Sequence, residues 1–101
     1  MTAHGEVWLA RLDKVRPVIV LTRDPVAQLL DAVLVVPITS TVRGIASEVA
    51  VGPADDGRRP SIASLDNVQL VERDRFLRRV GHAHSSTMEA ICESMHYTIG
   101  C

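Results

Sequence analysis

Two short apolar runs with polar residues at their ends dominate the pattern of the first half of the chain. Pro17–Leu21 follows Arg16, and Ala32–Ile38 is followed by the hydroxyl residues 39–41. Runs of this length, rich in Val and Ile, are typical of buried β-strands. Proline at the start of the first run suits a strand entry, and it favours extended geometry at the preceding arginine.

Shorter segments predict further strands around these two. Residues 5–12 precede the first run by a very short connection, Asp13-Lys14-Val15, which favours a hairpin. The other strand segments are 47–51, 61–65 continuing into 66–70, and 77–82, and residues 52–60 form the plainest loop. Five to seven short strands with brief connections predict a small, highly curved sheet or barrel.

Two segments have a helical pattern. Pro25–Leu30 predicts a short helix with Asp24 as its N-cap. Near the carboxyl end, Ser86 and Glu89 have the spacing of a capping box. Apolar residues recur there at helical intervals, at Met88, Ile91, Cys92, Met95 and Ile99. We therefore expect one amphipathic helix, ending near residue 100, to pack against the sheet, which makes the fold class mainly β (α+β).

The size and composition predict a single folded domain over residues 1–101. Apolar residues make up 47% of the chain but aromatic residues only 3%, so the core must be built from Val, Leu, Ile and Ala. No apolar run approaches the length of a membrane span, and the first residues lack the pattern of a signal peptide. We expect a cytoplasmic protein without a membrane partner. Cys92 and Cys101 belong to no metal-binding motif, so free thiols and no zinc are predicted.

The formal net charge of −1 argues against binding to nucleic acid by bulk electrostatics. Any nucleic-acid site must therefore be local. One group of basic residues flanks the first two strands, and it comprises Arg11, Lys14, Arg16 and Arg23. A later group, between residues 58 and 79, is interpreted as solvated surface.

Arg16 and Thr39 are the polar groups that the strand ends present. A guanidinium offers several donors in a fixed fork that fits phosphate oxygens, and a hydroxyl can donate one hydrogen bond. The two can therefore converge on one anion, such as a phosphodiester. In an arbitrary protein, however, each is more often solvated or bonded to nearby backbone, and these residues alone leave both interpretations open.

Three other features favour a structural role. Asp66-Asn67 is typical of a turn or a hydrogen-bonded pair. Trp8 suits a half-buried strand anchor better than a platform for stacking a base. His82 and His84, two residues apart on a predicted strand, face the same side and leave open an acid-base or metal pair, which we rank below a structural role.

Four segments, taken in order, resemble the MazF/PemK/Kid toxins of bacterial toxin-antitoxin pairs. Together with the final helix they cover nearly the whole chain. They are residues 5–8, residues 16–21 with 22–24 after them, residues 36–40 with Arg43-Gly44 after them, and residues 64–68.

The resemblance implies an SH3-like small barrel with a carboxyl-terminal helix, a homodimer, and a MazE-like antitoxin as partner. It also implies sequence-specific cleavage of single-stranded RNA (mRNA, tRNA or rRNA) without metal or other cofactor. The family's conserved arginine falls on Arg16 and its active-site threonine on Thr39, so we expect these to be catalytic. The residues expected to bind RNA are Lys14, Arg23, Ser40, Thr41 and Arg43.

Metal-independent cleavage of RNA uses the neighbouring 2'-hydroxyl as nucleophile and leaves a 2',3'-cyclic phosphate and a 5'-hydroxyl. Arg16 suits stabilisation of the extra charge on phosphorus, and it is a poor base because it stays protonated. The connection Asp13-Lys14-Val15 is shorter than the loop of better-known members, where a glutamate precedes the arginine. The general base and the recognised RNA sequence are therefore not identified.

Two functions from other classes stay open at this stage. A CcdB-like toxin has a similar fold but binds DNA gyrase and cleaves nothing, so it does not need Arg16 and Thr39. A catalytically silent RNA-binding module is the other alternative, if the short loop lacks the base. Cleavage assays with and without the two side chains separate these readings.

Overall fold

The computed structural model describes residues 3–22, 31–41, 44, 48–51 and 61–95. Its strands are β1 (Glu6–Arg11), β2 (Val15–Val20), β3 (Ala32–Thr39), β4 (Glu48–Val51), β5 (Ser61–Ser64), β6 (Gln69–Glu72) and β7 (Phe76–His82). Two 3-10 turns, η1 (Leu65–Asn67) and η2 (Arg73–Arg75), flank β6, and one helix, α3 (Ser85–Ser94), follows β7. The predicted helix Pro25–Leu30 and the distal part of the predicted last helix, including Ile99, lie outside the described residues.

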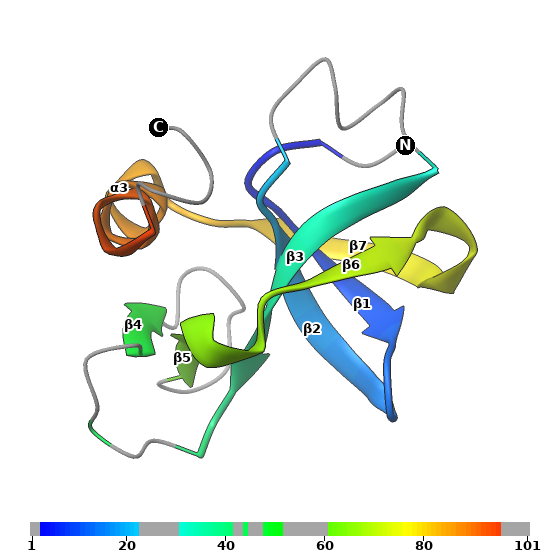
Figure 1. Cartoon of the computed structure of the whole chain (residues 1–101), viewed down its shortest axis with the longest axis horizontal. Helices are drawn as coiled ribbons and strands as arrows, with labels where there is room; N and C mark the ends of the chain where they lie inside the picture. Colours follow the sequence, from blue (N-terminus) through cyan, green and yellow to red (C-terminus); the bar gives the residue numbers. More distant parts are fainter. Residues whose placement is uncertain (1–2, 23–30, 42–43, 45–47, 52–60, 96–101) are drawn as a thin grey trace.

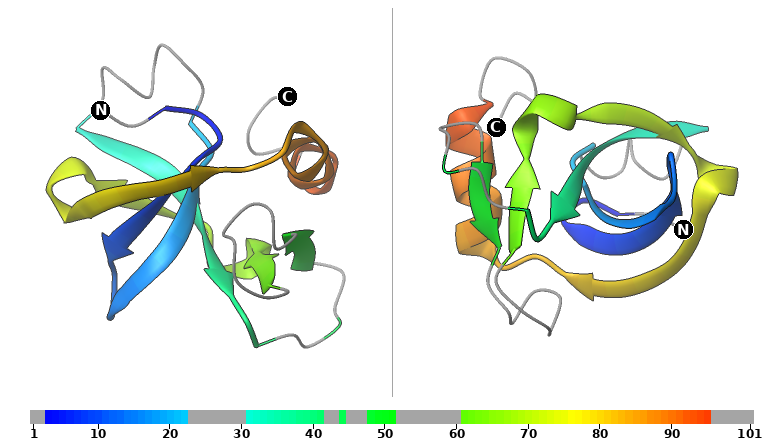
Figure 2. Two further views of the ribbon diagram at one scale, coloured as in Figure 1. Left: turned by 180° about the vertical axis from the view of Figure 1, so that it is seen from behind. Right: turned by 90° about the horizontal axis from the view of Figure 1, so that it is seen from below.

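The strands form one seven-stranded antiparallel sheet in the order β4-β5-β3-β2-β1-β7, with β6 paired to β3 off this path. β3 is the longest strand and has three partners, because it pairs with β2, with β5 at its end and with β6 at its start. The views in Figures 1 and 2 show the sheet curling, with β6 and β7 arching around β1 to β3 and α3 beside β4 and β5. The predicted mainly β, SH3-like barrel with a carboxyl-terminal helix is confirmed.

The apolar runs recognised in the sequence fill two cores on opposite faces of the same strands. One face of β2 and β3 joins a core of Ala10, Val18, Val20, Val33, Val35 and Val71. The alternate residues of these strands face a second core, in which Ile19, Val36 and Ile38 meet Ile91 of α3. β2 and β3 are therefore buried on both faces, which explains why their sequences are continuously apolar rather than alternating.

Helix α3 begins two residues earlier than its capping pattern predicts, at Ser85 instead of residue 87. Its N-cap is His84, and no side chain caps the helix, so the predicted Ser86–Glu89 capping box is wrong. Thr87 and Ile91, four residues apart, are the buried positions of the helix. Packing of this face against the sheet, rather than a local cap, sets where the helix begins.

The expectation of free thiols is wrong for Cys92, which is disulfide-bonded. The other cysteine of the chain, Cys101, lies outside the described residues. Cysteine spacing reveals metal and redox motifs, but it does not show which thiols the folded chain brings within bonding distance. Among the described residues, no helix has the length and apolar character needed to cross a membrane.

Candidate active site

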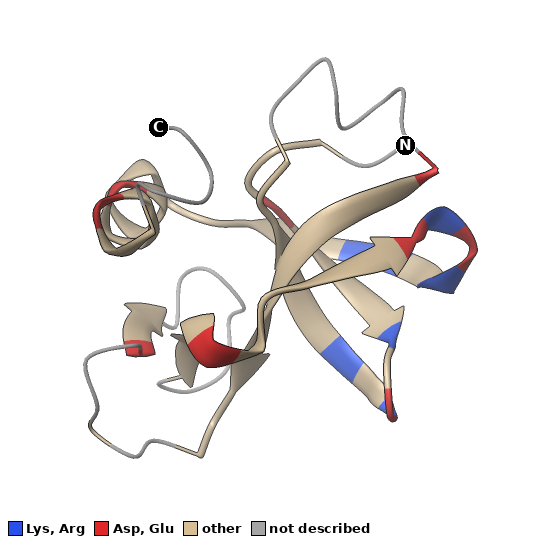
Figure 3. Cartoon of the chain, viewed as in Figure 1, with Lys and Arg blue, Asp and Glu red and all other residues tan. Residues whose placement is uncertain are grey.

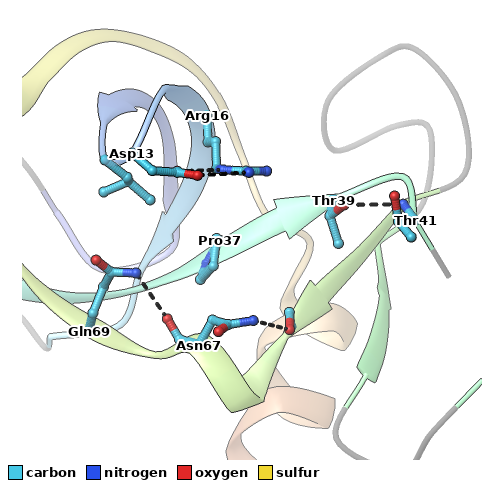
Figure 4. A pocket seen from close by; sticks show the side chains of 9 residues that line it. Asp13, Arg16, Pro37, Thr39, Thr41, Asn67 and Gln69 are labelled. Atoms are coloured by element: carbon cyan, nitrogen blue, oxygen red, sulfur yellow. Dashed lines mark hydrogen bonds and ion pairs between the residues drawn. The ribbon is translucent and has the colours of Figure 1, made fainter. Parts of the chain in front are cut away.

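Arg16 lies in β2, immediately after the tight connection from β1. It pairs with Ala10 across the hairpin, and the next residue is Pro17. Its guanidinium holds the carboxylate of Asp13 with two hydrogen bonds, from Nε to Oδ1 at 2.9 Å and from Nη2 to Oδ2 at 3.2 Å (Figure 4). This parallel two-bond arrangement is the geometry by which a guanidinium also recognises phosphate oxygens.

Asp13 and Arg16 reinforce each other's charge. The hydrogen bond from Arg16 lowers the pKa of Asp13 from its ordinary 3.8 to about 2, and the bond to Asp13 raises the pKa of Arg16. The Asp13 side chain is 70% exposed, so water screens the pair and its contribution to stability is small. The pair therefore orients the guanidinium more than it stabilises the fold.

Thr39 is the last residue of β3, and it pairs with Ile62 of β5. Its Oγ1 accepts a hydrogen bond from the backbone N–H of Thr41 at 3.1 Å. The local backbone bond considered for this strand end is therefore present. Because the oxygen accepts in that bond, the hydroxyl hydrogen can still be donated to another acceptor.

A third group of polar residues comes from β5, η1 and β6. Asn67 Nδ2 donates to Ser64 Oγ at 2.9 Å, and Gln69 Nε2 donates to the backbone oxygen of Asn67 at 3.3 Å. Ser64 is buried, whereas Asn67 and Gln69 are exposed. The prediction that Asn67 is a hydrogen-bonded turn residue is confirmed, and the structure adds that it faces a pocket.

These three groups line one pocket of about 380 Å³. Figure 4 shows Asp13 and Arg16 on one side of Pro37, Asn67 and Gln69 on the other, and Thr39 and Thr41 toward one end. The full lining is Leu12, Asp13, Arg16, Pro37, Thr39, Thr41, Ser64, Asn67 and Gln69.

The pocket contains only some of the residues that the sequence singled out. Arg16, Thr39 and Thr41 line it, whereas Lys14 and Ser40 are exposed and do not. Arg23 and Arg43 lie outside the described residues. Sequence reasoning did not select Asp13, Ser64 and Gln69, because their proximity depends on the pairing of β3 with β2, β5 and β6.

Other basic and histidine side chains lie away from the pocket. Figure 3 shows basic residues both at the β1–β2 hairpin end and on the η2 turn and β7. Arg79 of β7 donates to the buried Glu6 at 3.0 Å, which gives it a structural contact. His82 bonds the backbone oxygen of Ala83 at 2.8 Å, and within the described segments no group of three or more His, Cys, Asp or Glu side chains is placed to hold a metal ion.

Trp8 has the structural role predicted for it. Its indole packs edge-on against Phe76, with the ring centroids 5.8 Å apart, and Nε1 donates to Glu6 Oε1 at 3.0 Å. The ring contact joins β1 to β7, and the bond to Glu6 lies within β1, where Arg79 of β7 bonds the same carboxylate. The Trp8 side chain therefore anchors the pairing of these two strands.

The fold and the pocket together define a class of small curled β-barrels in which an arginine and a threonine, from two neighbouring strands, line one pocket. The sequence matches the family described as PemK-like, MazF-like toxin of type II toxin-antitoxin system over residues 3–98. The chain therefore belongs to this family.

Individual relatives agree with the family assignment. The chain is 38% identical over 104 residues to "Probable endoribonuclease MazF5" of Mycobacterium tuberculosis, covering 100% of this chain and 95% of that protein. It is 40% identical over 89 residues to "Endoribonuclease MazF3" of the same species, covering 88% and 86%. Its fold is similar to the solved structure "Mycobacterium tuberculosis toxin MazF-mt6", with a TM-score of 0.85, 39% identity, and coverage of 91% of this chain and 93% of that one.

Proposed function

We propose that this chain is the toxin of a type II toxin-antitoxin pair and acts in the cytoplasm as a sequence-specific, metal-independent endoribonuclease on single-stranded RNA. The observation that carries the proposal is the meeting of Arg16 and Thr39 in one pocket. Family membership supports it, as do the names of the relatives described above. A MazE-like antitoxin that covers the pocket and a homodimer complete the proposal.

In the proposed reaction, the 2'-oxygen of the RNA attacks the adjacent phosphorus. The bond from phosphorus to the 2'-oxygen forms and the bond to the 5'-oxygen breaks, which leaves a 2',3'-cyclic phosphate and a 5'-hydroxyl. The guanidinium of Arg16 stabilises the charge that develops on the phosphoryl oxygens, and Thr39 donates its hydroxyl hydrogen to one of them. Rate losses on the order of a hundredfold follow removal of donors of this kind.

Among the described residues that line the pocket, Asp13 carries the only carboxylate, which makes it the candidate proton acceptor. While Arg16 holds it, its pKa of about 2 makes it a weak base. When the guanidinium turns to the RNA phosphate, that interaction is lost and the pKa of Asp13 returns toward its ordinary value of 3.8. Binding of the phosphate thus leaves the Asp13 carboxylate able to accept the proton of the 2'-hydroxyl, and the leaving 5'-oxygen takes its proton from solvent water.

The test is cleavage of a long natural RNA in EDTA by the wild-type protein and by Arg16→Ala and Thr39→Ala, with the RNA ends mapped. Arg78→Ala is a matched control, because Arg78 is an exposed arginine of β7 that does not line the pocket. We expect cuts at a short recurring sequence that are lost in both pocket variants and kept in the control. Bound but intact RNA indicates a silent binding module instead, and absence of both binding and cutting indicates a protein target such as gyrase.

A further inference from the structure

The pairing of β1 with β7 brings together basic residues that are far apart in the sequence. Ala10 pairs with Phe76, so Arg11, the last residue of β1, and Arg75, the residue before β7, lie at the same end of the pair. Arg75 Nη1 donates to the backbone oxygen of Arg11 at 3.3 Å, which holds its guanidinium at the end of β1. Lys14 follows in the turn of the β1–β2 hairpin. We call Arg11, Lys14 and Arg75 the hairpin-end cluster.

The side chains of the hairpin-end cluster are exposed and have no acidic partner. In the part of the chain that the structure describes, the Arg11 and Lys14 side chains make no hydrogen bond or ion pair, and Arg75 bonds only a backbone oxygen. By contrast, Arg16 and Arg79 are each paired with a carboxylate. Cations that lie side by side repel one another, so the cluster attracts an anion that would relieve this repulsion.

The hairpin-end cluster adjoins the pocket that contains Arg16. Leu12 and Asp13 line the pocket, and in the chain they lie between Arg11 and Lys14. The backbone N–H of Leu12 donates to the backbone oxygen of Lys14 at 3.0 Å, which closes the turn. A strand of RNA that leaves the pocket over the hairpin therefore meets the cluster next.

We propose that the hairpin-end cluster holds backbone phosphates of the RNA segment beside the cleavage site, which makes Arg11 and Arg75 positioning residues. The guanidinium of Arg75 keeps N–H donors for a phosphate after its bond to Arg11 is counted. Contacts of this kind add affinity without reading bases. The inference rests on the proposed function, because it deepens it by placing the RNA that continues beyond the pocket.

A local cluster of this kind also suits the charge of the whole chain. The formal net charge is −1, so RNA cannot be held by general attraction to the protein surface. The sequence alone separates Arg11 from Arg75, and only the β1–β7 pairing unites them. Binding should therefore depend on these particular arginines and not on arginines elsewhere on β7.

The first test is binding of RNA that cannot be cut. A 2'-O-methyl RNA of random sequence, about twenty nucleotides long, lacks the nucleophilic hydroxyl, and fluorescence anisotropy gives its dissociation constant over a series of salt concentrations. Arg11→Gln and Arg75→Gln should each weaken binding about threefold. Each should also lower the slope of log affinity against log salt by about 0.7, the value for one phosphate contact of a single strand.

Two further variants separate a phosphate contact from other roles. Arg75→Lys keeps the charge and a donor, so it should restore the wild-type salt slope. Arg78→Gln is the matched control, because Arg78 is an exposed arginine that pairs with Leu9, farther from the hairpin. It should leave the affinity and the slope unchanged. Thermal unfolding verifies that each variant is folded.

The second test is steady-state cleavage of natural RNA in EDTA. Residues that only position flanking RNA should affect KM and not the chemical step, so Arg11→Gln and Arg75→Gln should each raise KM about threefold at an unchanged kcat. A purely structural role of the Arg75 bond to Arg11 would instead lower the unfolding temperature and leave the salt slope of binding as in the wild-type protein.

The outcomes that overturn the inference differ from those that overturn the proposed function. Unchanged affinity and salt slope in the Arg11→Gln/Arg75→Gln double variant overturn the cluster, as does an equal loss in Arg78→Gln. Competition by polyglutamate as strong as that by unlabelled RNA assigns the cluster to an acidic protein partner and also overturns it. If the binding effects are found but the wild-type protein cuts no natural RNA, the cluster stands and the endoribonuclease proposal falls. If RNA is cut but the double variant binds like the wild-type protein, the reverse holds.

Discussion

Replacement of Glu6 tests how the β1–β7 edge of the barrel is held. The Glu6 side chain is only 10% exposed and accepts from three donors, which are Trp8 Nε1 at 3.0 Å, Arg79 Nη1 at 3.0 Å and the backbone N–H of Ala3 at 2.8 Å. Arg79 is 63% exposed, so its bond contributes less than about 1 kcal/mol. Each of the other two, made to a charged acceptor, contributes about 1.5 kcal/mol.

Glu6→Ala is therefore expected to lower the free energy of unfolding at pH 7 by about 3 kcal/mol. A chain of this size loses about 4–8 °C of melting temperature per kcal/mol, so the midpoint should fall by roughly 15 °C. Differential scanning calorimetry measures the change, and Glu72→Gln, at an exposed carboxylate of β6, is the control and should leave the midpoint unchanged.

The same site predicts a pH dependence. Burial raises the pKa of Glu6, but the bonds from Trp8, Arg79 and Ala3 outweigh it, so the pKa lies below its ordinary 4.5. A carboxylate whose pKa is lower in the folded state than in the unfolded state stabilises the fold fully when the pH is above the unfolded-state pKa. This stabilisation is lost as the pH falls through the folded-state pKa. The difference in free energy of unfolding between the wild-type protein and Glu6→Gln should therefore become smaller as the pH is lowered from 7 toward 3. The reasoning is refuted if this difference in free energy is constant over the pH range. It is also refuted if the melting temperature of Glu6→Ala lies within about 2 °C of the wild-type value.

Two further predictions concern the hairpin and the start of β1. Asp13→Asn removes the carboxylate that competes with RNA for Arg16, so KM for RNA should fall severalfold. The value of kcat should fall by at least about tenfold, as expected for loss of a general base. An unchanged kcat, measured by steady-state cleavage of a fluorogenic RNA, excludes Asp13 as the proton acceptor. Gly5→Ala should destabilise the fold, because Gly5 has φ +85° and an added Cβ would lie 2.9 Å from His82 Cε1. The free energy of unfolding, measured with urea, should fall by about 1–2 kcal/mol, and an unaltered urea midpoint contradicts this expectation.

The strands were the most predictable part of the fold. β2 and β3 are read from their continuous apolar runs because both faces are buried, and the tight β1–β2 connection follows from the three residues between them. The start of α3 was less predictable, because Thr87 and Ile91 anchor the helix by packing whereas the capping pattern is local. Cys92 likewise shows that thiol pairing depends on the fold rather than on spacing.

The candidate site was predictable only in its chemically distinctive members. Arg16 and Thr39 stand at strand ends and carry groups suited to a phosphate, so the sequence pattern draws attention to them. Gln69 belongs to a short exposed strand and has no motif around it. It reaches the pocket because Gln69 pairs with Val35 of β3, and a register between strands so distant in sequence is not readable from residue order.

The central claim, that Arg16 and Thr39 act on one phosphate, is tested most directly by a double-mutant cycle of single-turnover RNA cleavage in EDTA. Arg16→Ala and Thr39→Ala should each slow the reaction on the order of a hundredfold or more. Because groups that act together on one transition state are not additive, the double variant should lose much less than the product of the two single losses. A Thr39→Ala rate equal to wild type, or losses that multiply in full, would contradict the account.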